Sequence, residues 1–166
     1  MASSDVYSTV FSLRRNDGRD YLLTVSPSEK QALLQSGLWA ELCHPFVGPT
    51  AFCVDPSLQD GSRGPFLLRS QVNDVRGGSD AHQRFAGFRP VYRCVGEEQL
   101  HFFSSDPQCD QRGRAESVLG YASVARGGDT LRELFHCFDS AALLDFHSLD
   151  IPCPSHTAQT SVGFVT

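Results

Sequence analysis

Four stretches of the chain carry the same short features in the same order, and this repetition constrains the fold more than any other property of the sequence. Each stretch opens with a β-prone segment. The central residues of these segments, Val10, Ala51, Val91 and Leu134, are 41, 40 and 43 residues apart. We therefore interpret residues 1–166 as a single domain built from a repeat of about 41 residues. The four units span approximately 7–49, 50–89, 90–125 and 131–166.

Within each unit a second β-prone segment follows the first, and an apolar pair with glycine comes later. The second segments are residues 21–24, 66–69, 101–104 and 146–149, and the glycine pairs fall at 47–48, 86–88, 119–121 and 162–164. One such unit has too little apolar surface to fold alone, so several units must pack together and cover their strand edges. The expected fold is all-β and closed, with four units in a small propeller-like ring. A β-trefoil of three units of about 50 residues is the alternative.

One short helix is expected inside the first unit. Ser26 is a typical N-cap, Pro27 suits the first helical position, and Glu29 follows the cap by three residues, which is the pattern of a capping box. Gly37 is expected to end this helix.

The six cysteines follow the repeat. Cys94 and Cys109 are 15 residues apart in the third unit, and Cys137 and Cys153 are 16 apart in the fourth. Equivalent spacing predicts two equivalent disulfides, each stabilising the fold by about 3 kcal/mol in the chain-entropy estimate. The remaining pair is Cys43 with Cys53. Free thiols and a metal site are the alternatives, but the chain lacks the close Cys-x-x-Cys pairs of zinc sites, so no metal is expected.

Charge and composition exclude several classes of partner. The formal net charge is −5 and the only lysine is Lys30, which argues against sequence-independent nucleic-acid binding. No apolar run is long enough to cross a bilayer, and residues 1–5 show no signal peptide. Disulfides are nevertheless typical of oxidising compartments, so an extracellular or secreted location is expected. No Asn-x-Ser/Thr site is present, so no N-glycans are expected.

Three segments of the third unit carry a family resemblance. Residues 91–94 read Val-Tyr-Arg-Cys, residues 100–109 contain His-Phe-Phe-Ser-Ser-Asp, and residues 116–121 end in Leu-Gly-Tyr. They resemble the "YR…DHFYTT…EGxxGY" pattern of an uncharacterised repeat in bacterial, fungal and invertebrate extracellular accessory modules. Residues 20–26 and 145–150 occupy the place of the middle motif in the first and fourth units. The histidine of that motif is present only at His101.

The resemblance implies an extracellular accessory module, for which carbohydrate binding is a common role by analogy. Sugars are held by aromatic faces together with carboxylates, amides or arginine. The expected partners are therefore glycans or glycoconjugates, and a homo-oligomer is left open. The candidate ligand-binding residues are Arg93, His101, Asp106, Glu116, Tyr121, His136, Asp145, His147 and Asp150.

Catalysis is not expected. The chain has no Gly-x-Ser-x-Gly elbow, no Gly-rich phosphate loop and no His-Glu-x-x-His motif, and no cofactor is implied. Asp106 and Asp150 precede tight turns, where an Asp side chain commonly bonds its own backbone. His101 and His147 lie in apolar strands, where a side chain of alternate facing can cap the core or face solvent. The leading hypothesis is a lectin-like module without catalytic activity. The alternatives are a structural or protein-interaction module of an extracellular fluid or matrix, and an enzyme inhibitor or toxin-like cap.

Overall fold

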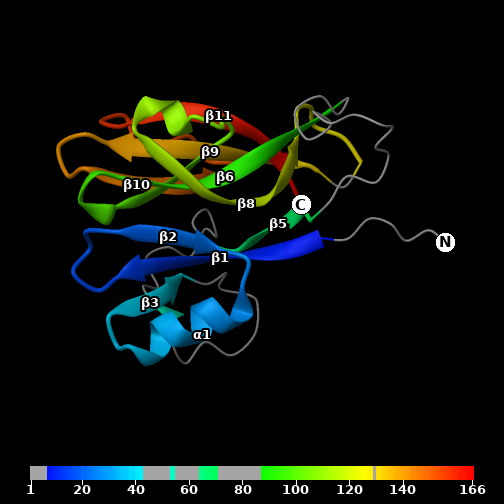
Figure 1. Cartoon of the computed structure of the whole chain (residues 1–166). Coiled ribbons are helices and arrows are strands. Elements are labelled where there is room, and N and C mark those ends of the chain that lie inside the picture. The colour runs from blue at the N-terminus through cyan, green and yellow to red at the C-terminus, as the bar shows by residue number, and fades with distance from the viewer. Residues whose placement is uncertain (1–6, 43–52, 55–63, 71–86, 129) are drawn as a thin grey trace.

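The computed structural model describes residues 7–42, 53–54, 64–70, 87–128 and 130–166, with only the backbone described at 53–54. It is all-β with one α-helix (Figure 1). The elements are β1 (Tyr7–Arg15), β2 (Tyr21–Thr24), α1 (Pro27–Gln35), β3 (Trp39–Leu42), β4 (Cys53–Val54), β5 (Phe66–Arg69), β6 (Phe88–Gly96), η2 (Glu97–Gln99), β7 (His101–Ser104), η3 (Cys109–Gln111), β8 (Gly113–Ser123), β9 (Arg132–Asp139), β10 (Leu144–Leu149) and β11 (Ala158–Val165). No helix in the described residues is long and apolar enough to span a membrane.

Three parts of the chain have the same strand arrangement. In each, the first strand lies in the middle and pairs antiparallel with the second and the third: β1 with β2 and β3, β6 with β7 and β8, and β9 with β10 and β11. We call these groups units A, C and D. Unit A and α1 lie at the bottom of Figure 1, and units C and D lie above them.

The strands pair into one sheet, which is antiparallel except between β3 and β4. Its strand order begins at β10 and ends at β4, and these two strands do not pair with each other, so the sheet is not closed within the described residues. The expected closed ring of hydrogen-bonded strands is therefore not seen. The short strands β2, β7 and β10 instead lie close to one another, and each contributes buried side chains to one core cluster, without closing the ladder.

The second predicted unit is the least described. Its strand at 66–69 is present as β5, which pairs with β1 and β8. The glycine pair at 86–88 was expected to end this unit, but Phe88 instead begins β6. The predicted strand at 50–52 and the glycine pair at 47–48 lie outside the described residues.

The core lies where the short strands meet. Every residue of β2 is buried, as are the last three of β7 and the last five of β10. The largest buried cluster includes Val10, Leu68, Phe103, Leu134 and Phe146. These residues come from five strands of different units, so the units share one hydrophobic core.

The helix forms as its capping residues predict, with one difference. The Ser26 hydroxyl accepts a 3.1 Å hydrogen bond from the Glu29 backbone N–H, and Gly37 has a φ of +76° after the last turn. The reciprocal half of the capping box is absent, because Glu29 binds Arg93 and the Ser26 backbone N–H donates to the Thr24 hydroxyl. The helix is therefore tied to β6 of unit C by its own first turn.

Two of the three predicted disulfides are described. Cys94 bonds to Cys109 and Cys137 bonds to Cys153, as the repeat symmetry predicts. Each joins a central strand to the turn that follows the short strand. The predicted Cys43–Cys53 pair lies outside the residues whose side chains are described.

Candidate functional site

Arg93 stands at the junction of units A and C. Its Nη1 and Nη2 atoms donate to the two Glu29 carboxylate oxygens at 2.7 and 3.0 Å, and Nε donates to Glu116 at 2.9 Å. Nη1 also donates to the Leu23 carbonyl at 3.2 Å. Four hydrogen bonds and an exposed side-chain fraction of 15% leave this guanidinium little capacity for a ligand.

The charges of this cluster reinforce each other. The hydrogen bond from Arg93 lowers the pKa of Glu29. Burial opposes the charged form of Arg93, but the hydrogen bonds and charges of Glu29 and Glu116 outweigh it and raise the pKa of Arg93. The cluster thus forms an ion-paired contact between unit C and the helix α1 that follows β2 of unit A.

His101 joins the same junction. Asp20 accepts from the His101 backbone N–H at 2.8 Å and lies 2.7 Å from ring atom Nδ1. The other ring nitrogen, Nε2, is 3.8 Å from Glu116. The structure therefore brings together three of the predicted ligand residues, Arg93, His101 and Glu116, but it occupies them with one another and with unit A.

A second cluster lies at the junction of units C and D. Arg112 donates from Nη1 and Nη2 to the two carboxylate oxygens of Asp145, both at 2.9 Å. The Asp145 oxygen bonded to Nη1 is also 2.6 Å from Nε2 of His136. Asp145 is only 5% exposed, and its charge is compensated by the Arg112 guanidinium inside the protein.

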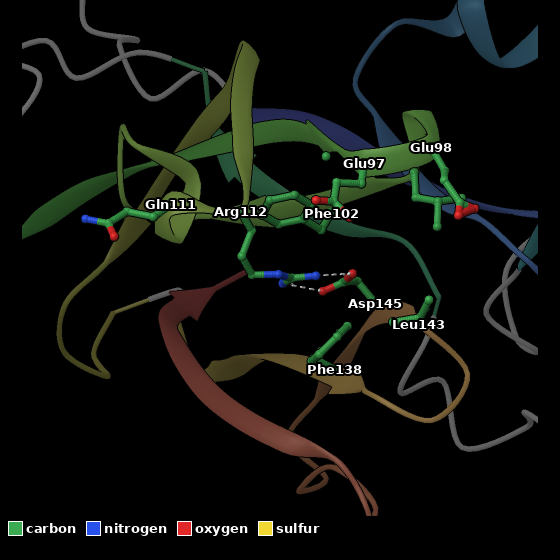
Figure 2. Close-up of a pocket in the computed structure, with 10 residues that line it drawn as sticks. Glu97, Glu98, Phe102, Gln111, Arg112, Phe138, Leu143 and Asp145 are labelled. Carbon is green, nitrogen blue, oxygen red and sulfur yellow. Dashed lines mark hydrogen bonds and ion pairs between the residues drawn. The ribbon is translucent and has the colours of Figure 1, made fainter.

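Two phenyl rings cover the faces of the Arg112 guanidinium. Its central carbon is 4.4 Å from the ring centroid of Phe102 and 4.2 Å from that of Phe138. Figure 2 shows Arg112 between these rings, with its two hydrogen bonds to Asp145 dashed. This arrangement fixes the position of the arginine far more firmly than a surface ion pair would.

A cavity of about 360 Å³ opens beside this arginine. Arg112, Asp145, Phe102 and Phe138 line it together with residues from η2, from the end of η3 and from the β9–β10 turn (Figure 2). The remaining lining residues are Gly96, Glu97, Glu98, Leu100, Gln111 and Leu143. The cavity is therefore built by units C and D together and combines apolar walls with a few fixed polar groups.

Glycines and a disulfide position Arg112. A Cβ atom on Gly96 would lie 2.8 Å from the Arg112 carbonyl oxygen, and one on Gly113 would lie 2.2 Å from the Val95 carbonyl oxygen. Only glycine permits so close an approach of the chain before β8 to the end of β6. The Cys94–Cys109 disulfide ties the same two segments together three residues before Arg112.

The walls of the cavity carry unusual backbone. Glu98 in η2 and Leu143 in the β9–β10 turn have φ values of 58° and 54°. Non-glycine residues rarely adopt this left-handed conformation. Both side chains are exposed, and Leu143 is 57% exposed.

His147 serves the core. It is fully buried; Nε2 is 2.9 Å from the Gly64 carbonyl oxygen and Nδ1 is 2.6 Å from the Tyr21 hydroxyl. A carbonyl oxygen can only accept, so Nε2 carries a proton and donates it to Gly64. The Ser12 hydroxyl donates to Tyr21 at 2.6 Å, which completes a buried polar chain between units A and D.

Asp106, Asp150 and Tyr121 were also proposed as ligand residues, and the two aspartates accept hydrogen bonds from backbone N–H groups. Asp106 accepts from the backbone N–H groups of Gln108 and Asp110. Asp150 accepts from the backbone N–H of Glu133. Tyr121 is half-buried in β8, where it pairs with Arg69. Of the nine candidates, only Asp145 lines the cavity.

Sequence reasoning missed most of this cavity. It did not select Arg112, Phe138, Glu97, Glu98 or Leu143. Arg112 follows the second cysteine of its unit and precedes Gly113, which is a weak signal of a tight turn. Phe138 lies near the end of β9, and Glu97, Glu98 and Leu143 lie between paired strands. These four residues come together only through the packing of unit C on unit D.

The hydrogen bonds of Asp145 limit its use as a proton acceptor. Both Asp145 oxygens already accept from Arg112, and one also contacts His136, so this carboxylate is poorly placed to take a proton from a substrate. In the described part of the chain, no three or more His, Cys, Asp and Glu side chains converge in a way that could hold a metal ion. The arrangement is suited to positioning polar and apolar surface for binding.

Comparisons with known proteins find no relative. No family model matches the chain, and no curated protein or solved structure matches it either.

Proposed function

We propose that this protein is a non-catalytic, lectin-like module that binds carbohydrate in the cavity between units C and D. The observation that carries the proposal is the immobilised Arg112–Asp145 pair in a cavity with both apolar and polar walls. A sugar ring presents C–H groups to apolar surface and hydroxyls to hydrogen-bonding side chains. A cavity of about 360 Å³ lies in the size range of small-molecule sites.

The residues of the cavity divide these tasks. Leu143 and Phe138 provide apolar surface for the ring. Glu97, Glu98 and Gln111 provide side-chain oxygens that can accept from sugar hydroxyls, and the Gln111 amide can also donate. Arg112 has five N–H donors, of which Asp145 takes two, so donors remain for a hydroxyl or ring oxygen.

The proposal includes the setting of the module. Two disulfides suit an extracellular or secreted protein, where glycans are available as partners. We also propose that units A, C and D and the second predicted unit, approximately residues 50–89, derive from one repeat. These units would pack into a propeller-like or trefoil-like domain. In that arrangement, each junction between units offers a place for a ligand site.

A glycan array tests the proposal. The labelled, non-reduced protein is applied to neutral, amino and uronic sugars, and the proposal predicts a set of hits that share one terminal residue. Leu143→Ala should weaken binding of a hit about five-fold, because it removes apolar contact of about 1 kcal/mol.

The matched control is Leu131→Ala. Leu131 is 52% exposed, close to the 57% of Leu143, but it does not line the cavity. Its replacement should leave binding unchanged. A blank array with protein shown to be folded by circular dichroism would contradict the proposal and favour a structural or protein-interaction module.

A further inference from the structure

The charge of Arg112 is not available to an anionic ligand. Asp145 neutralises it through two 2.9 Å hydrogen bonds, and Phe102 and Phe138 hold the guanidinium from both faces. Asp145 is 5% exposed and also contacts His136, so it cannot swing away without leaving a buried charge unpaired. A sugar carboxylate would have to displace this pair to use the arginine.

Two other charges of the cavity are not neutralised. The carboxylates of Glu97 and Glu98 form no hydrogen bond or ion pair with any described residue. The carboxylates of the junction between units A and C differ in this respect, because Glu29 and Glu116 bind Arg93 and Asp20 binds His101. With the Arg112–Asp145 pair compensated, Glu97 and Glu98 set the charge that a ligand meets.

We propose that the cavity selects amino sugars that carry a protonated amine and rejects uronic sugars. The inference rests on the carbohydrate-binding function proposed above and names the ligand class of that site. A sugar ammonium group would donate charge-assisted hydrogen bonds to Glu97 and Glu98 while its ring lies against Leu143 and Phe138. A uronate would bring a third uncompensated negative charge to the same cavity, which costs binding energy.

Three tetrasaccharides of matched linkage test this selectivity: β-1,4-linked glucosamine, its N-acetylated form and a uronic-acid form. Affinities are measured by calorimetry at about pH 5.5, where an ordinary carboxyl group is ionised and an amino sugar keeps its proton. The glucosamine tetramer should bind about ten-fold more tightly than the neutral one, as expected for charged hydrogen bonds. The uronic tetramer should bind at least ten-fold more weakly than the neutral one.

The double variant Glu97→Gln, Glu98→Gln should remove the preference for the amine, so that it binds the glucosamine tetramer and the neutral tetramer with affinities within about two-fold of each other. Asp17→Asn is the control, because it removes an exposed carboxylate in the β1–β2 turn that pairs with Arg15. This control should keep the full preference. Thermal unfolding of each variant confirms that the fold is intact.

The outcomes separate this inference from the proposed function. Equal affinity for all three tetramers, tighter binding of the uronic form, or a preference that persists in the double variant would overturn the amino-sugar selectivity and leave sugar binding standing. No binding of any tetramer, with a blank array, would overturn both.

Discussion

Arg93 and Arg112 are held in the same manner at two junctions of the molecule. Each donates two parallel hydrogen bonds to a carboxylate of a different unit, Arg93 to Glu29 of α1 and Arg112 to Asp145 of β10. The fork geometry of a guanidinium suits such pairs, whereas a lysine would contribute only a point charge. Arg112 lines the cavity between units C and D, and Arg93 is not among the residues that line it.

Among single-residue changes, Asp145→Ala is expected to destabilise the protein by about 2–3 kcal/mol. It leaves the Arg112 guanidinium partly buried without its carboxylate and removes the partner of His136. The value is at the low end for a broken buried pair, because the Arg112 side chain is 35% exposed. Urea unfolding measures the change.

Asp17→Ala serves as the control for Asp145→Ala. Asp17 is exposed and pairs with Arg15 in the same turn, so the unfolding midpoint should be unchanged. An equal loss of stability in both variants would contradict the role given to Asp145.

The buried Tyr21 hydroxyl gives a second prediction. Tyr21→Phe removes the group that lies between Ser12 and His147, at 2.6 Å from each, and should cost about 1–3 kcal/mol. Tyr121→Phe is the matched control, because no described residue bonds its hydroxyl, and it should change stability by less than about 0.5 kcal/mol. Unfolding midpoints that shift equally in the two variants would show that the buried chain is unimportant.

Among the elements, α1 is short, buries no residue fully and depends on its neighbours. Ser26 caps its first turn, and the Glu29–Arg93 pair ties that turn to β6. The Lys30 ammonium group adds a contact to Glu41 of β3 at 3.3 Å. The helix is therefore held mainly by polar contacts to the strands on either side.

The Glu29–Arg93 pair makes part of the stability dependent on pH. Arg93 lowers the pKa of Glu29 below its ordinary value of 4.5 in the folded protein. A depressed carboxyl pKa gives stability that is present above the unfolded pKa and is lost as the pH falls through the folded pKa. The protein should therefore lose stability from about pH 5 downward, in part through this group.

Glu29→Gln tests the pH dependence. The variant should be less stable than the parent at neutral pH, and its stability should fall less between about pH 5 and pH 3. Denaturant unfolding across this range measures both curves. Parallel curves for the variant and the parent would contradict the assignment.

The strands β8 and β11 approach each other closely at Gly163. The register of β11 against β9 shifts at a bulge beside Gly163, which has a φ of +143°. A Cβ atom there would lie 2.7 Å from the Ser123 carbonyl oxygen and 3.0 Å from the Cβ atom of Ala122. Gly163 thus lets β11 approach β8 where units C and D join.

Gly163→Ala is expected to destabilise the protein by about 1–3 kcal/mol, through both the clash and the left-handed backbone. Gly127→Ala is the control, because a Cβ atom there would meet nothing within 4 Å. Thermal unfolding compares the two variants. A loss of stability at Gly163 no larger than that at Gly127 would show that the close approach does not matter.

For the molecule as a whole, the recurring pattern of short features in the sequence predicted the position of several elements. The first and second strands of three units, the helix and two disulfides appear where the pattern placed them. These features depend on local spacing, which a sequence displays directly. The predicted closed ring is not seen in the described residues. Closure depends on how the strand edges of different units meet, and no local sequence pattern records those contacts.

The candidate site was less accessible to prediction for the same reason. Motif residues Arg93, His101 and Glu116 do come together, but their polar atoms bind one another and unit A. The cavity instead uses turns of units C and D whose residues, such as Glu98 and Leu143, share no spacing or motif. Their proximity arises from the packing of two units, which the sequence does not encode in any single segment.

The most direct test of carbohydrate binding in this cavity is a map of backbone amide chemical shifts in ¹⁵N-labelled protein titrated with each sugar class of the array. The account predicts that the largest changes fall in residues 96–99, 111–112 and 143–145, which surround the cavity. Changes centred on Arg93 and His101, or no change at saturating concentrations of any sugar, would contradict it.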